Sequence, residues 1–239
     1  MQHYPASDHY DSRHRRFYAA EPPRPLQHGI KALWKMMRYG RHTYPPAPLP
    51  ILPPDWPAFL SPTGKSRFIW FGHSTLLMRI GGQTLITDPV FGGNVSPVPF
   101  TMRRFQPPAA PLAELPPLDV VLISHNHYDH LERVTHKRLV HTHTHYIVPL
   151  GLGAQLQRWG IPATRISELD WWQSIERNGI RYTALPARHY SGRGMFDHNR
   201  SLWVGYHIEY SDEHYYFHGD SAWGRHFETI AAHIGHPDI

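Results

Sequence analysis

The segment Val120-Val-Leu-Ile-Ser-His-Asn-His-Tyr-Asp-His130 joins an apolar run to a dense group of metal-binding side chains. The run from Val120 to Ile123 is continuously apolar, which predicts a buried strand. Side chains on a loop at the end of a strand can converge on one point, and metal ligation removes the cost of burying polar groups. A solvated histidine-rich loop is the alternative interpretation. The candidate ligands are His125, His127, Asp129 and His130.

The composition of the chain supports a metal site built from imidazole and carboxylate. The 239 residues include 21 His and no Cys, which excludes disulfides, Cys-ligated zinc, iron–sulfur clusters and thiol nucleophiles. The formal net charge of +5 suits anionic partners. No apolar stretch is long enough to cross a membrane, and Met1–Tyr10 lacks the apolar core of a signal peptide. We therefore expect a cytoplasmic protein, with peripheral contact to a membrane as an alternative.

The chain divides into a Pro-rich N-terminal extension, residues 1–65, and a hydrolase-like domain, residues 66–239. The extension contains one helix candidate, Leu26–Tyr39, whose apolar residues recur at helical spacing. That helix either packs on its own domain or lies on a membrane surface. The domain mixes hairpins, strands and helices, which predicts an α/β class with helices covering the sheets.

The expected elements of the domain begin with a hairpin, in which Gly81-Gly82 forms the turn between Thr75–Ile80 and Thr84–Thr87. His141, His143 and His145 alternate, which places them on one face of an extended segment, as a solvated surface or an adventitious metal site. The other predicted strands are Phe68–Trp70, Val120–Ser124, Tyr146–Pro149, Arg181–Ala184, Leu202–Tyr210 and Tyr215–His218. The predicted helices are Leu131–Val140, Gly151–Trp159 and Phe227–Ile234.

The motif His-x-His-x-Asp-His after an apolar strand resembles the signature of the metallo-β-lactamase superfamily. Further segments are similar to its N-acyl-phosphatidylethanolamine-hydrolysing phospholipase D branch, from about residue 65 onward. They are Trp70-Phe-Gly-His-Ser-Thr75, Thr87-Asp-Pro-Val-Phe91, Pro149-Leu-Gly-Leu152, Leu169-Asp-Trp-Trp172, Pro186-Ala-Arg-His-Tyr-Ser-Gly-Arg-Gly194, Asn199-Arg-Ser-Leu-Trp203 and Phe217-His-Gly-Asp220.

The resemblance implies an αββα sandwich, incomplete at its C-terminus, with two zinc ions at one edge of the sheets. It implies that His125, His127 and His189 bind one zinc ion, and that Asp129 and His130 bind the second. Asp220 matches the carboxylate that bridges both ions. The branch supplies a last His ligand downstream of that Asp, but only 19 residues follow Asp220 here. We therefore expect a C-terminally truncated chain, with His226, His233 and His236 in its tail.

Four other residues are candidates for supporting roles. Asp88 resembles the first-motif Asp of the family and is expected to orient the metal-binding loop by hydrogen bonds, with a simple turn before Pro89 as the alternative. His73, Arg188 and Arg193 are candidates for substrate binding, since Arg suits phosphate recognition. Surface charge is the competing interpretation of the two arginines.

The expected function is zinc-dependent hydrolysis of a phosphodiester, phospholipase D-like, by a metal-bound hydroxide. Asp129 and Asp220 are the expected catalytic carboxylates. The expected substrate is a small molecule or a phospholipid, and no nucleic-acid partner is expected. A metal-dependent lactonase or ester hydrolase is one alternative, and a truncated metal-binding domain without turnover is another. His and Asp ligands also accept iron or manganese.

Overall fold

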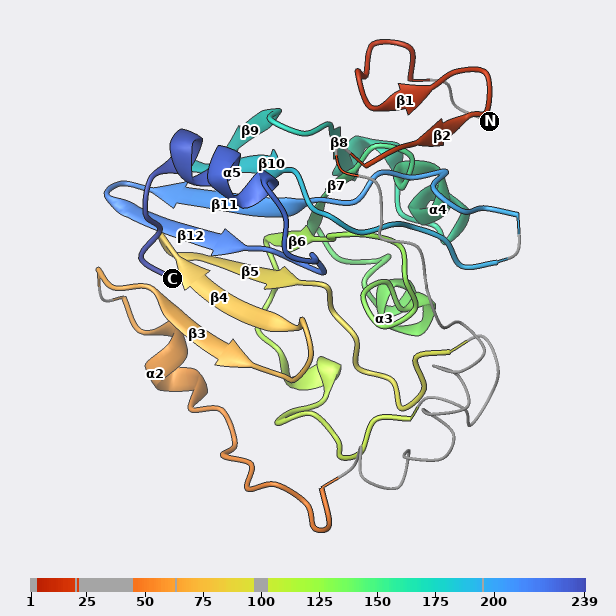
Figure 1. Ribbon diagram of the computed structural model, residues 1–239. Coiled ribbons are helices and arrows are strands. Elements are labelled where there is room, and N and C mark those ends of the chain that lie inside the picture. The colour runs from red at the N-terminus through yellow and green to blue at the C-terminus, as the bar shows by residue number, and fades with distance from the viewer. Residues whose placement is uncertain (1–3, 20, 22–44, 63, 97–102, 195) are drawn as a thin grey trace.

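The computed structural model describes residues 4–19, 21, 45–62, 64–96, 103–194 and 196–239. The predicted helix Leu26–Tyr39 lies outside these residues. Two sheets dominate the described part of the chain, and Figure 1 shows the four-stranded sheet between α5 and the yellow strands of the six-stranded sheet.

The six-stranded sheet runs in the order β3-β4-β5-β6-β7-β8. Its first three strands pair antiparallel, and β5 to β8 pair parallel. Gly81 and Gly82 form the two-residue turn between β4 and β5, with φ of 55° and 75°, which glycine adopts without steric cost. The strands are β3 (Arg67–Trp70), β4 (Leu76–Ile80), β5 (Gln83–Thr87), β6 (Val120–Leu122), β7 (His145–Pro149) and β8 (Ile166–Leu169).

The four-stranded sheet is antiparallel throughout, in the order β12-β11-β10-β9. A separate two-stranded hairpin near the N-terminus carries Tyr10 and Phe17, which belong to the core that also contains residues of both larger sheets. The strands of the larger sheet are β9 (Ser174–Arg177), β10 (Ile180–Leu185), β11 (Gly205–Tyr210) and β12 (Glu213–Phe217), and those of the hairpin are β1 (Tyr10–Asp11) and β2 (Arg16–Phe17).

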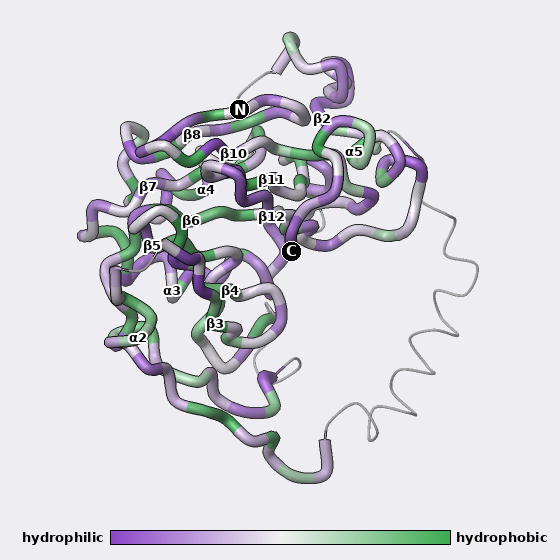
Figure 2. Tube along the Cα trace, turned by 90° about the vertical axis from the view of Figure 1, so that its left-hand side faces the viewer, coloured by the Kyte–Doolittle hydropathy of each residue, from purple (hydrophilic) through white to green (hydrophobic). Residues whose placement is uncertain are grey.

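Alternate residues of β6 face two separate cores. Val120 and Leu122 pack with Trp203, Tyr206 and other residues between the two sheets. Val121 and the following Ile123 pack on the opposite face with residues around the helices. A strand buried on both faces must be apolar at every position, and Figure 2 shows β6 as a hydrophobic stretch.

The helices of the described residues are α2 (Trp56–Leu60), α3 (Arg133–Arg138), α4 (Gly153–Arg158) and α5 (His226–Ile234), with short 3-10 turns η2 (Leu112–Glu114) and η3 (Ala163–Arg165).

This arrangement confirms the predicted α/β sandwich, with helices outside both sheets. The predicted hairpin, the buried strand and α5 form within two residues of their expected bounds. β8 and β9 were not predicted, because Ile166–Leu169 and Ser174–Arg177 are short and partly polar. The predicted strand from Leu202 begins at Gly205 instead.

The expectation for His141, His143 and His145 is wrong in part. The first two are exposed and precede the strand, whereas β7 begins at His145. His145 is buried, and its Nε2 lies 2.9 Å from Ser167 Oγ of the neighbouring strand. The three side chains therefore do not share a solvated strand face.

Within the described residues, no helix has both the length and the apolar character of a membrane span.

His136 on α3 is a buried neutral imidazole in the helix-side core. Its exposed fraction is 0%, and its Nδ1 lies 3.3 Å from the hydroxyl of Tyr146. Burial lowers the pKa of His136 to about 3, below its ordinary value of 6.5. The unfolded chain therefore binds a proton between these two pH values that the folded chain does not bind. The stability contributed by the neutral form is present above pH 6.5 and is lost as the pH falls toward 3.

The free energy of unfolding of the wild type should fall as the pH drops below 6.5. We expect His136→Phe to reduce the slope of this fall by up to about 1.4 kcal/mol per pH unit. Phenylalanine keeps an apolar ring at this position and cannot take up the proton. Urea unfolding at pH 5, 6 and 7 measures the slope, with the exposed His143→Phe as the control. Equal slopes in the wild type and His136→Phe would contradict the assignment.

Candidate metal centre

The predicted ligands lie at one edge of the sandwich because of strand direction. β5 and β6 run parallel, so Asp88 and the loop beginning at His125 leave the sheet on the same side. β4 runs antiparallel to β5, so the turn that carries His73 lies there as well. In the facing sheet, β10 and β12 run in the same direction, and each leads to a ligand after it ends, His189 and Asp220.

Three histidines form the first cluster. The ligand nitrogens of His125, His127 and His189 all lie within 4.8 Å of one another. His125 Nε2 is 2.8 Å from His127 Nδ1, and His189 Nε2 is 3.1 Å from that same nitrogen. Two of these residues come from the loop after β6 and one from the facing sheet. The fold therefore brings together the three residues expected to hold one metal ion.

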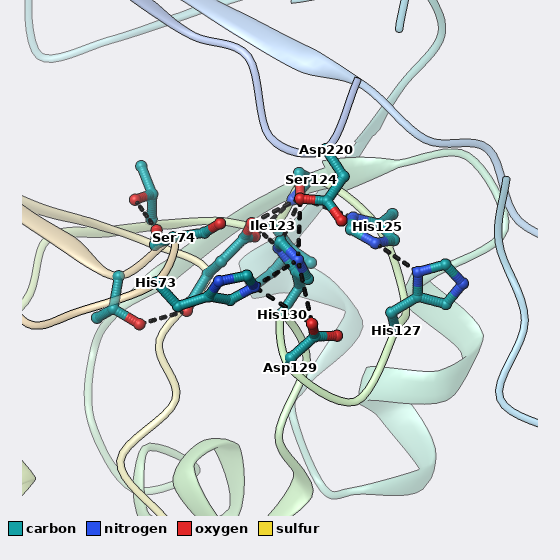
Figure 3. A network of polar contacts seen from close by, with 12 residues as sticks. His73, Ser74, Ile123, Ser124, His125, His127, Asp129, His130 and Asp220 are labelled. Atoms are coloured by element: carbon teal, nitrogen blue, oxygen red, sulfur yellow. Dashed lines mark hydrogen bonds and ion pairs between the residues drawn. The ribbon is translucent and has the colours of Figure 1, made fainter. Parts of the chain in front are cut away.

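A second cluster contains His73, His130 and Asp220, whose ligand atoms also lie within 4.8 Å of one another. His130 Nε2 is 3.1 Å from His73 Nε2 and 3.3 Å from Asp220 Oδ1. Asp129 Oδ2 lies 3.2 Å from His73 Nε2 and 3.8 Å from His130 Nε2. Figure 3 shows His73, Asp129 and Asp220 around His130, with His125 and His127 to the right in this view.

Asp220 spans the two clusters. Its Oδ1 lies 3.3 Å from His130 and its Oδ2 lies 3.6 Å from His189. The hydrogen bond from His130 outweighs partial burial and lowers the pKa of Asp220 to about 2. The carboxylate is therefore ionised at neutral pH, with one oxygen toward each cluster. This is the geometry that a bridging ligand needs.

The protonation states of the first cluster fit a bound cation. Burial lowers the pKa of His125 well below its usual value, and burial also lowers the pKa of His189 to about 4. The pKa of His127 is lowered for the same reason. These three imidazoles are neutral at pH 7, which is the form that binds metal.

The second cluster carries the opposite charge balance. Burial would lower the pKa of His130, but the carboxylates of Asp220 and Asp88 outweigh it and raise this pKa to about 10. Asp129 is ionised as well, since the hydrogen bond from His73 and the charge of His130 outweigh burial and lower its pKa. The proton on His130 thus supplies positive charge among three carboxylates. A metal cation at this position would take over that role.

A buried hydrogen-bond network around Asp88 fixes the loop after β6. Asp88 has an exposed fraction of 0%, and its Oδ1 accepts a hydrogen bond of 2.7 Å from the backbone N–H of Ser124. Its Oδ2 accepts from Ser124 Oγ at 2.6 Å and lies 2.7 Å from His130 Nδ1. The geometry supports the expected orienting role, because the contact at Nδ1 leaves His130 Nε2 directed at the cluster.

Gly219 permits the close approach that places Asp220. Its φ is 58°, and a Cβ at this position would lie 2.6 Å from Ser124 Cβ. Any larger residue would push the segment after β12 away from the loop after β6. The glycine of the motif Phe217-His-Gly-Asp220 therefore allows the loop after β12 to lie against the loop after β6.

The two arginines expected to bind substrate make extensive protein contacts. Arg193 Nη1 donates to the carbonyls of Asn126 and Leu131 at 2.9 and 2.6 Å, and its guanidinium lies 3.7 Å from the centre of the Tyr128 ring. Arg188 Nη1 donates to the carbonyl of Trp223 at 2.7 Å. These contacts favour roles in holding the loops beside the metal centre, and substrate binding by either arginine stays a prediction.

His73 was expected at most to bind substrate, but the structure places it in the second cluster. Its φ is 47°, and its carbonyl accepts a hydrogen bond of 2.9 Å from the Trp70 indole. The antiparallel order of β3, β4 and β5 is the signal that could have located His73 in this cluster.

The histidines expected in the C-terminal tail make contacts outside the two clusters. His226 lies 2.8 Å from Ser221 Oγ, and the His233 ring stacks on Trp172.

Comparisons with known proteins agree with this geometry. The family model described as a beta-lactamase superfamily domain matches residues 83–239. An uncharacterised protein of Mycobacterium tuberculosis is 37% identical over 87% of this chain and 55% of its own length. The N-acyl-phosphatidylethanolamine-hydrolysing phospholipase D 1 of Caenorhabditis elegans is 36% identical over 71% of this chain and 51% of its own. The chain thus spans about half the length of these curated relatives.

Among solved structures, a diiron beta-hydroxylase from Streptomyces venezuelae is similar, with a TM-score of 0.56 and 25% identity. The match covers 74% of this chain and 34% of that one. The family model, the curated relatives and the fold all indicate the same superfamily. The chain belongs to the beta-lactamase superfamily, in the branch similar to the N-acyl-phosphatidylethanolamine-hydrolysing phospholipases D.

Proposed function

We propose that this chain carries the metal centre of a zinc-dependent hydrolase that cleaves a phosphodiester with an apolar substituent, as a phospholipase D does. Water would add to phosphorus, and the bond from phosphorus to the alcohol oxygen would break. The products are a phosphomonoester, such as a phosphatidic acid, and the free alcohol. The observation that carries the proposal is an apolar hollow that reaches the metal centre.

This hollow has a volume of about 660 Å³ and is lined by His73 and Asp129 of the second cluster. Its walls include Leu52, Trp70 and Phe105, whose exposed fractions are 87%, 67% and 51%. Exposed apolar side chains that surround a concavity are typical of a ligand or membrane contact. The hollow could take an acyl chain while the phosphate lies at the clusters. This supports a phospholipid substrate and peripheral contact with a lipid surface.

The charge of the lining also fits an anionic headgroup. Arg103 and Arg104 belong to the same hollow. Arg104 donates to the carbonyls of Phe71 and Val90, at 3.0 and 2.6 Å, and so holds the wall in place. The two guanidinium groups add positive charge near the position proposed for the phosphate.

The residues that would hold two zinc ions are His125, His127 and His189 on one side and His73, Asp129 and His130 on the other, with Asp220 between. Bound ions would lower the pKa of water and stabilise the negative charge that develops on the phosphate oxygens. Asp129 lies at the junction of the hollow and the cluster, where its carboxylate can orient the attacking water or accept its proton. Asp220, with a pKa of about 2, is better suited to holding ligands in position than to accepting a proton.

The first test is the hydrolysis of bis(p-nitrophenyl) phosphate by the zinc-loaded chain. We expect turnover in the wild type and a loss of at least about a hundredfold in His127→Ala, because one ion loses a ligand. Metal content measured by mass spectrometry should fall in parallel. The exposed His143→Ala serves as the control. Activity that survives in His127→Ala would refute the assignment, whereas two bound zinc ions without turnover would support a metal-binding domain that does not catalyse.

A second experiment tests whether His73 is a ligand. His73→Ala should weaken binding of the second zinc ion about tenfold or more, while the first ion stays bound, since its cluster does not contain this residue. A competition titration with a chromophoric chelator separates the two affinities. If both affinities match those of the wild type, His73 contributes no ligand.

A third experiment tests the hollow. Leu52→Asp should raise KM for a phospholipid presented in mixed micelles by about tenfold and leave turnover of bis(p-nitrophenyl) phosphate unchanged. A charge placed among the apolar walls opposes binding of an acyl chain only. Phe196→Asp is the matched control, because Phe196 has an exposed fraction of 76% and does not line the hollow. Equal effects on both substrates would contradict the proposed role.

A further inference from the structure

The outward face of the β11–β12 hairpin carries a third group of metal-binding side chains, His207, Glu209 and His214. On β11, Tyr206 and Ile208 point into the core between the sheets. Because successive strand residues face opposite ways, His207 and Glu209 share the other face. That face lies on the side of the sheet where Figure 1 places α5. Glu209 pairs directly with His214 on β12, so all three side chains gather on one patch.

The ligand atoms of these residues are close enough to hold one ion. One atom from each residue lies within 4.8 Å of the other two. His207 Nε2 is 3.2 Å from His214 Nδ1, and His207 Nδ1 is 3.5 Å from Glu209 Oε2. A tetrahedral zinc site with bonds of about 2.0 Å separates its ligand atoms by about 3.3 Å. These two contacts involve different nitrogens of His207, and one ion can bind only one of them. The fit to a single ion therefore rests on the one atom from each residue that lies within 4.8 Å of the other two.

The chemistry of the three groups favours a transition metal. His207 has an exposed fraction of 3%. A neutral imidazole donates its lone pair to a metal ion. Two imidazoles and one carboxylate form a ligand set that zinc accepts, with a fourth position left for water.

We propose that His207, Glu209 and His214 form an additional binding site for a divalent transition-metal ion of the zinc type. The site is distinct from the two clusters described above, because it lies at the turn end of the β11–β12 hairpin, whereas Asp220 follows the opposite end of β12. An ion here ties β12, an edge strand, to β11. Its role is to stabilise the strand that leads to Asp220.

The experiment counts zinc in chains that have been stripped with EDTA, reloaded with zinc chloride and passed through a desalting column. The background is His127→Ala, which removes a ligand from one of the two ion sites proposed above, and the zinc count of each added substitution is compared with that of this background. Adding Glu209→Gln or His214→Gln should remove one further zinc ion per chain. Adding His141→Ala and His143→Ala together removes two exposed histidines outside the cluster and should leave the count unchanged.

A second measurement addresses folding. Circular dichroism in EDTA should give the same spectrum for the background and for each added substitution. The rise in melting temperature produced by zinc should be smaller in His214→Gln than in the background. An unchanged zinc count in both Glu209→Gln and His214→Gln would overturn the proposal. An equal loss in the control pair would overturn it too, since it would indicate nonspecific binding to surface histidines.

Discussion

The buried carboxylate of Asp88 organises the metal centre. It accepts hydrogen bonds from the backbone and side chain of Ser124 and lies 2.7 Å from His130 Nδ1. A buried charge is tolerated only when it is fully paired, so each of these groups depends on the others. The network fixes the start of the loop after β6 and the direction of His130. Both clusters depend on this loop, because it carries His125 and His127 as well.

The sandwich concentrates ligands by the direction of its strands. The candidate ligands from the two sheets meet at the edge where β6, β10 and β12 end, and Gly219 lets the segment before Asp220 lie against Ser124. Burial lowers the pKa of His189 to about 4, whereas the carboxylates of Asp220 and Asp88 outweigh burial and raise the pKa of His130 to about 10. The hollow lined by His73 and Asp129 opens beside the two clusters.

The edge that carries the two clusters and the β11–β12 hairpin bring candidate ligands together in different ways. The edge uses loops from two sheets, so its geometry depends on the whole sandwich. The hairpin uses two neighbouring strands, where the pairing of Glu209 with His214 and the alternation from His207 to Glu209 suffice. A site of the second kind is held by local register alone and therefore suits a structural ion.

The pattern of residues was enough to predict the class of fold, the buried strand at Val120, the glycine turn at Gly81 and the candidate ligands His125, His127, Asp129 and His130. These features are local, since periodicity, turn chemistry and short spacing encode them. The position of His73 beside His130 and Asp220, the contacts of Arg193 with a loop and the burial of His145 became visible in the folded chain. Such contacts depend on which strands pair and in which direction. That information arises from the packing of distant segments and does not follow from the pattern of any one of them.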